Sequence, residues 1–176
     1  MKKLLMLSLF VLAFMLTSCK KDDNSTNVTP SDPIVGTWVS TGANVPYGLR
    51  VAPFKVVKIV ATFNDNKSYT VVQTDSANVL TTFTGTYSDN NSTYTDTGST
   101  SFTKGATIIN IVANQASPST VTSTGMYCVS GSNMTYEIIQ TTPALGVNPP
   151  TPAQGFGSTS VGTTKYPIYI QKYVRQ

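Results

Sequence analysis

Few residues of this chain could carry out acid–base, nucleophilic or metal-dependent chemistry. Its 176 residues include no histidine, which is the commonest general base and the commonest metal ligand in proteins. Glycoside hydrolysis needs two carboxyl groups that face one cleft. Of the acidic residues after Pro33, only Asp75, Asp96 and Glu137 could form such a pair, and no motif links them. The sequence therefore predicts a protein that is not an enzyme and that holds no metal ion or cofactor.

The other acidic residues have local explanations. Asp65 and Asp89 lie in two stretches rich in Asn, Asp and Ser, Asn64–Lys67 and Ser88–Asn91. Both stretches are typical of turns, in which an Asp side chain caps the backbone. Glu137 alternates with apolar neighbours, so it points to solvent if those neighbours line the core. If the interior is partly polar, Glu137 could instead contact a ligand.

The chain contains two cysteines in different surroundings. Cys128 lies in an apolar stretch with no basic cluster beside it, so we expect a buried, unreactive thiol rather than a disulfide or a metal ligand. Cys19 ends an N-terminal pattern of a cationic start, an apolar run over Leu4–Leu16 and two small residues. This pattern is typical of a secretory signal, and the run is too short for a transmembrane span. We therefore predict a signal peptide over residues 1–18.

Residues Leu16–Cys19 resemble the lipobox of bacterial lipoproteins, whose cysteine thiol receives a diacylglycerol and becomes the new N-terminus. The resemblance implies that acyl chains such as palmitate on Cys19 anchor the protein to a membrane, with roughly 0.8 kcal/mol for each buried methylene. The charged residues Lys20–Asp23 are similar to the export tag of Bacteroidetes lipoproteins, which implies surface exposure on the outer membrane. Residues 19–33 would then be the lipidated cysteine and a flexible tether. An ordinary cleaved signal peptide is the alternative.

Residues 34–176 suit one globular domain that is large enough to enclose a core. This part of the chain has eight Lys and Arg against five Asp and Glu, and its basic residues are scattered. Proteins that bind nucleic acids use clustered basic residues to follow the phosphate backbone. We therefore expect no nucleic-acid partner.

Stretches with β-strand composition, separated by turn residues, fill this domain. A phase change in the alternation near Val57 indicates a β-bulge. The Pro- and Gly-rich residues 141–165 exclude a central strand, because proline removes a donor from the ladder. The expected strands are Val35–Thr41, Phe54–Phe63, Ser68–Thr74, Val79–Tyr87, Ala106–Val112, Thr120–Val129, Asn133–Gln140 and Tyr166–Val174, with weaker pieces at Thr93–Thr97 and Ser101–Thr103. About eight to ten short strands at meander spacing indicate an antiparallel barrel or sandwich.

The start of the domain, Ile34–Trp38, resembles the Gly-x-Trp motif that opens the first strand of lipocalins. Two later segments are similar to hairpin strands of bacterial lipocalin-like lipoproteins, namely Thr84–Ser88 and Met126–Ser132. The resemblance implies an all-β fold over residues 34–176, a single antiparallel up-and-down barrel of about eight strands of the lipocalin or calycin type. The usual lipocalin disulfide is absent. Residues 141–165 have no counterpart in the common family pattern.

The lipocalin resemblance also implies roles for particular residues. Trp38 would plug one end of the barrel, and a basic residue near the C-terminus, Arg175 or else Lys172, would pack over its indole ring. The implied function is non-catalytic binding of a small apolar or amphipathic ligand inside the barrel. The interior side chains that we expect near such a ligand are Phe63, Tyr69, Phe83, Tyr136 and Ile168. The alternative is a barrel filled by these side chains, in which the loops contact a surface protein or a glycan.

Overall fold

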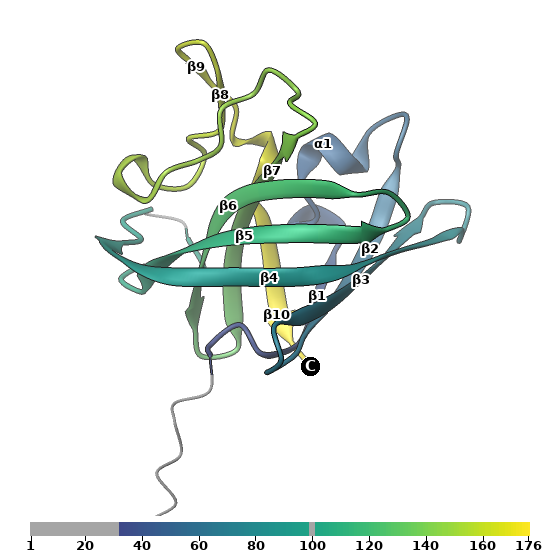
Figure 1. Ribbon diagram of the computed structural model, residues 1–176, viewed down its shortest axis with the longest axis horizontal. Coiled ribbons are helices and arrows are strands. Elements are labelled where there is room, and N and C mark those ends of the chain that lie inside the picture. The colour runs from purple at the N-terminus through teal and green to yellow at the C-terminus, as the bar shows by residue number, and fades with distance from the viewer. Residues whose placement is uncertain (1–31, 99–100) are drawn as a thin grey trace, which may run out of the picture.

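The computed structural model describes residues 32–98 and 101–176, most of which form one closed β-barrel (Figure 1). The barrel strands are β1 Gly36–Thr41, β2 Val56–Phe63, β3 Ser68–Asp75, β4 Leu80–Thr95, β5 Thr107–Ser117, β6 Val121–Ser130, β7 Asn133–Thr142 and β10 Gln171–Arg175. Successive strands pair in antiparallel fashion, and β10 closes the barrel against β1. The predicted all-β up-and-down barrel of eight strands is therefore confirmed. The predicted signal peptide, Cys19 and most of the tether lie outside the described residues.

Short elements occupy the connections at one end of this barrel. Helix α1 (Tyr47–Arg50) lies between β1 and β2, and a small hairpin of β8 (Ser160–Val161) and β9 (Thr164–Lys165) lies between β7 and β10. Three 3₁₀ turns, Gly42–Asn44, Pro152–Gln154 and Pro167–Tyr169, complete the connections. Within residues 32–98 and 101–176, no helix has the length and apolar character needed to cross a membrane.

The two ends of the barrel differ in the length of their connections. At the end that holds the described N-terminal residues and the C-terminus, two of the three connections are tight turns, at residues 64–67 and 131–132. The opposite end carries the long connections, residues 42–55 with α1 and residues 143–170 with β8 and β9 (Figure 1). We call these the closed end and the open end.

Alternation along the strands produces the apolar interior. Side chains of a strand point alternately to its two faces, and on β2 the inward residues Ile59, Ala61 and Phe63 are all buried. Inward residues of the other strands continue this core, among them Trp38, Tyr69, Tyr87, Ile111, Tyr127, Met134, Tyr136 and Tyr173. Eight strands enclose a space just wide enough for side chains or for one small ligand, so the interior packing decides between these two uses.

One predicted turn is wrong. Residues Ser88–Asn91 continue β4, which pairs with β5 from Thr84 to Thr95 without reversing. Asp89 lies opposite Ile111 in this pairing, and its side chain faces the interior. Long-range pairing with β5 therefore outweighs the local turn preference of the Ser, Asp and Asn side chains. The predicted strand piece Ser101–Thr103 is also wrong, because these residues lie in the connection after β4.

The predicted last strand is too long at its beginning. Residues Pro167–Tyr169 form a 3₁₀ turn, and β10 starts only at Gln171. Proline has no N–H to donate to a ladder but fits the first turn of a helix, which explains the late start. Ile168 therefore lies outside the barrel wall instead of on an interior strand face.

Backbone irregularities occur where the pairing shifts. The predicted bulge near Val57 is confirmed, because the register between β2 and β3 shifts between Val56 and Lys58.

Gly125 on β6 marks a close approach of two backbones: a Cβ atom there would lie 2.1 Å from the carbonyl oxygen of Glu137 on β7. Such contact leaves no room for a side chain, so glycine is required at this position.

A second buried layer covers the outer face of β5, β6 and β7. Ile108, Met126 and Cys128 face outward from the barrel and are nevertheless fully buried. The connection between β4 and β5 reaches this face, since the Cys128 thiol donates a hydrogen bond to the Thr103 hydroxyl (2.8 Å). Burial raises the pKa of the Cys128 thiol to about 12, so this cysteine is protonated and unreactive at neutral pH.

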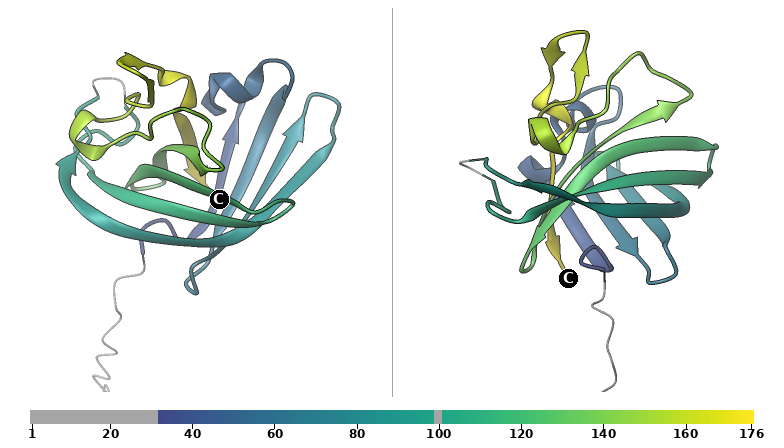
Figure 2. Two further views of the ribbon diagram at one scale, coloured as in Figure 1. Left: turned by 45° about the horizontal axis from the view of Figure 1, so that its top comes forward. Right: turned by 60° about the vertical axis from the view of Figure 1, so that its left-hand side comes forward.

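Glu137 does not point to solvent, because residues 157–159 cover it. Its side chain is fully buried and accepts hydrogen bonds from the Gly157 N–H (2.5 Å), the Thr159 N–H (3.1 Å) and the Thr159 hydroxyl (2.5 Å). These contacts fix residues 157–159 against β7, within the long connection that Figure 2 shows at the open end of the barrel. The Pro- and Gly-rich segment therefore covers part of the outer face of β7.

Candidate functional site

The closed end of the barrel is sealed by Trp38 and Arg175. The Trp38 indole is fully buried, and its Nε1 donates a hydrogen bond to the Ile34 carbonyl oxygen (2.7 Å). The Arg175 guanidinium lies over the indole at 4.2 Å from the ring centroid and donates to the carbonyl oxygens of Val35 (2.6 Å) and Pro33 (2.8 Å). This is the pairing that the lipocalin resemblance implies. Lys172 instead lies over the Phe102 ring.

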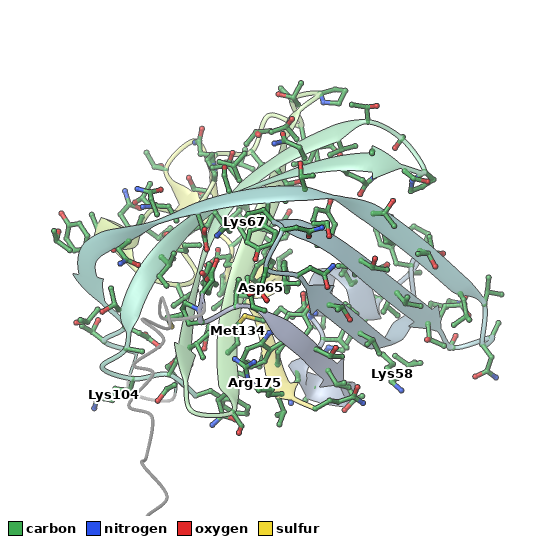
Figure 3. All side chains as sticks on the ribbon, turned by 60° about the horizontal axis from the view of Figure 1, so that its bottom comes forward. Lys58, Asp65, Lys67, Lys104, Met134 and Arg175 are labelled. Carbon is green, nitrogen blue, oxygen red and sulfur yellow. The ribbon has the colours of Figure 1, made fainter. Side chains whose placement is uncertain are left out.

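The glycine of the Gly-x-Trp motif has a steric explanation in this end. Gly36 has a φ of +130°, a backbone conformation that other residues rarely adopt. A Cβ atom on Gly36 would also lie 2.5 Å from Arg175 Nη1. Gly36 therefore lets the chain turn into β1 while the guanidinium lies directly against it. Figure 3 is drawn from the side of this closed end and labels Arg175 and Lys67.

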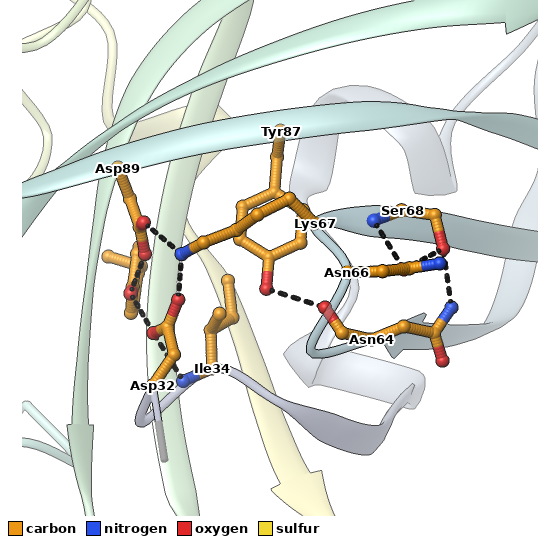
Figure 4. Close-up of polar contacts among 9 residues, drawn as sticks. Asp32, Ile34, Asn64, Asn66, Lys67, Ser68, Tyr87 and Asp89 are labelled. Atoms are coloured by element: carbon orange, nitrogen blue, oxygen red, sulfur yellow. Dashed lines mark hydrogen bonds and ion pairs between the residues drawn. The ribbon is translucent and has the colours of Figure 1, made fainter. Parts of the chain in front are cut away.

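A charged cluster fastens the N-terminal residues to the same end (Figure 4). The Lys67 ammonium lies between two carboxylates, 2.5 Å from Asp32 and 2.7 Å from Asp89, and the Tyr127 hydroxyl donates to Asp89 (2.6 Å). Burial opposes ionisation of Asp32, but the hydrogen bond from Lys67 and further hydrogen bonds outweigh it and hold the pKa of that carboxyl below its usual value. Asp32 and Pro33 thus belong to the barrel end, whereas the sequence analysis assigns them to the tether. We assign this cluster a structural role.

The open end holds an unfilled cavity of about 210 Å³ inside the barrel. Phe63, Tyr69, Phe83 and Tyr136, four of the five side chains predicted to lie near a ligand, line it. Ile168, the fifth, does not. It lines a neighbouring cavity of about 570 Å³ that the connections at the open end enclose.

Aromatic rings form the floor of the inner cavity. Phe63 packs edge-to-face against Tyr87, with 5.3 Å between ring centroids, and Tyr136 packs edge-to-face against Tyr173 at 6.1 Å. Phe63 and Tyr136 also contact each other at 6.4 Å. Such pairs are stabilising and rigid. These rings lie between the cavity and the closed end of the barrel.

Helix α1 lies over the mouth of the cavity. Its Leu49 lines the inner cavity, the outer cavity and a third hollow of about 360 Å³ beside β3 and β4. Leu49 is absent from the predicted lining residues, because a residue in a long connection carries no periodic signal that shows where it packs. Exposed apolar side chains line the outer cavity and the third hollow, namely Val51, Phe54, Val79 and Leu145.

A few uncharged polar groups interrupt the apolar wall of the inner cavity. They include the side-chain amides of Gln73, Gln115 and Gln171 and the hydroxyl of Ser123. Burial raises the pKa of the lining Tyr69, Tyr136 and Tyr173, so their phenols are neutral at physiological pH. Gln171 is also absent from the predicted lining residues. It lies two residues before Tyr173, so both side chains are on the same face of the strand.

Comparisons of the chain with protein-family models, with curated proteins and with solved structures give no match. The class of the protein is therefore defined by the fold and the site together. It is an eight-stranded up-and-down β-barrel whose closed end is sealed by an arginine–tryptophan pair and whose open end holds an apolar cavity.

Proposed function

We propose that this chain is a lipid-anchored, lipocalin-like protein of the outer-membrane surface that binds a small apolar or amphipathic ligand without catalysing its conversion. The observation that carries the ligand-binding proposal is the unfilled cavity of about 210 Å³, which has a mostly apolar wall and an aromatic floor. Ligand sites are typically apolar concavities with a few convergent polar groups. A second cavity of about 570 Å³ shares Leu49, Tyr136, Ile138 and Gln171 with the first and extends it toward solvent.

The position of the N-terminal residues supports the proposed anchoring. Asp32 and Pro33 are bound to Lys67 and Arg175 at the closed end. A lipid on Cys19 would therefore attach to the barrel at its closed end, and the open end would stay free of the attachment point. The membrane is then a partner only through the lipid.

Binding is tested with N-phenyl-1-naphthylamine, an uncharged dye whose fluorescence rises in apolar surroundings. We expect saturable binding by the purified protein. Ala113 lines the inner cavity, so Ala113→Phe should fill it and weaken binding at least about tenfold, which corresponds to about 1.4 kcal/mol. Ala116→Phe is the matched control, because Ala116 lies on the exposed face of the same strand, β5.

Two outcomes of the dye titration contradict ligand binding. One is a wild-type protein that does not bind the dye saturably, and the other is equal binding by Ala113→Phe and Ala116→Phe. In either case the filled-barrel alternative applies, in which the loops contact a surface protein or a glycan. That alternative has one observation in its favour, the exposed apolar side chains at the connection between β3 and β4, where Val79 is 58% and Leu80 is 64% exposed.

The proposed anchor makes a separate prediction. Cells that express the chain and are fed an alkyne analogue of palmitate should label it, and Cys19→Ala should remove the label because the acceptor thiol is lost. Cys128→Ala is the matched control, since Cys128 is the other of the two cysteines and its thiol is buried. Full labelling of Cys19→Ala would contradict the lipoprotein proposal while leaving the ligand-binding proposal open to its own test.

A further inference from the structure

Gln171 lines the inner cavity and carries a buried side-chain nitrogen that has no hydrogen-bond partner within the described part of the chain. The residue is 6% exposed, and this nitrogen is Nε2. Burial raises the pKa of Tyr173, and the nearby Gln171 amide offsets part of this rise. The amide nitrogen and the Tyr173 hydroxyl nevertheless do not meet the geometry of a hydrogen bond. Buried polar groups are nearly always paired in folded proteins. An unpaired donor on a residue that lines a cavity therefore points to a ligand acceptor atom.

Gln171 lies between the two cavities and lines both of them. Gln171 lies opposite Tyr136 in the pairing of β10 with β7, and both residues line the inner and the outer cavity. Ile59, Val71 and Phe83 form part of the apolar wall of the inner cavity. An elongated ligand can thus place an apolar body against this wall and an oxygen atom at Gln171 Nε2.

The cavity offers no charge to balance an ionised ligand. None of the side chains that line the inner or the outer cavity, within the described part of the chain, is Lys, Arg, Asp or Glu. The nearest basic residue of the α1 segment, Arg50, donates instead to the Val45 carbonyl oxygen (3.0 Å) and lies over the Tyr47 ring. Burial of an unpaired carboxylate is strongly unfavourable, whereas an uncharged oxygen needs only a donor.

We propose that the open-end cavity selects uncharged amphiphiles, such as long-chain alcohols and esters, whose oxygen accepts a hydrogen bond from Gln171 Nε2, over ionised fatty acids of the same chain length. This inference rests on the proposed ligand-binding function and names the class of ligand.

The test is displacement of bound N-phenyl-1-naphthylamine by three ligands with similar chains: 1-decanol, methyl decanoate and decanoate at pH 7.5. We expect decanol and methyl decanoate to displace the dye at concentrations at least about tenfold lower than decanoate. In Gln171→Met, which keeps the side-chain length but removes the amide, we expect decanol and methyl decanoate to bind at least about fivefold more weakly. Gln154→Met is the matched control, because Gln154 is exposed and lines neither cavity.

The outcomes separate this inference from the function on which it rests. A wild-type protein that does not bind the dye overturns the proposed function and this inference with it. Dye binding that Ala113→Phe weakens, together with equal displacement by decanol and decanoate, overturns only this inference. So does unchanged alcohol and ester binding in Gln171→Met. The comparison of ligands on the wild-type protein requires no variant, so it remains decisive if Gln171→Met does not fold.

Discussion

Replacement of Trp38 by alanine is expected to lower the free energy of unfolding by about 3–5 kcal/mol, the range for truncation of a large buried aromatic side chain. Three contacts are lost together. The indole fills the closed end of the barrel, its Nε1 donates to the Ile34 carbonyl oxygen, and its face supports the Arg175 guanidinium. Removal of the ring leaves a cavity beneath a charged group that also holds Pro33 and Val35.

Urea unfolding followed by circular dichroism measures this loss, with Tyr94→Ala as the control because Tyr94 is a half-exposed aromatic residue on β4. The control should change stability by less than about 1 kcal/mol, since substitutions at exposed positions away from packed features have small effects. The wild-type emission is a second check. Trp38 is the only tryptophan, so its fluorescence should have the short-wavelength maximum of a buried indole. Emission typical of a solvent-exposed indole would contradict the closed-end packing.

The second large effect is expected at Glu137. Glu137→Leu removes the acceptor of three hydrogen bonds and leaves the donors of Gly157 and Thr159 in a buried site. Each buried donor that is left without its acceptor costs about 1–3 kcal/mol. We expect part of this cost to appear locally, because the covering segment between β7 and β10 can detach before the barrel unfolds.

Two measurements separate local from global loss. Urea unfolding gives the stability of the barrel, and limited trypsin digestion followed by mass spectrometry gives the rate of cleavage after Lys165, which lies in the covering segment. Glu137→Leu should accelerate this cleavage strongly, and Glu137→Gln, which keeps one acceptor oxygen, should do so less. Asp65→Asn is the control, because Asp65 is exposed in a turn. Unchanged cleavage in Glu137→Leu would mean that Glu137 does not hold the segment.

Much of the barrel follows from short-range pattern. Alternation with a period of two correctly places Phe63, Tyr69, Phe83 and Tyr136 at the cavity wall, because the pleat of a strand fixes which residues share a face. The packing of Arg175 on Trp38 is what the lipocalin resemblance of the Gly-x-Trp motif implies, and the structure has this contact. Strand alternation depends on residues near in sequence, so the sequence alone determines which side chains share a face.

Other features depend on contacts between distant segments, and only the tertiary structure decides them. Asp89 has the local sequence of a turn but lies within β4, because pairing with β5 and an ion pair with Lys67 outweigh the local preference. Glu137 has the alternation of a solvent-facing residue but is buried, because a segment twenty residues later covers that face of β7. The cavity itself is such a feature. Filled and open barrels alternate alike in sequence, and the volume that remains depends on how side chains from all eight strands meet across the interior.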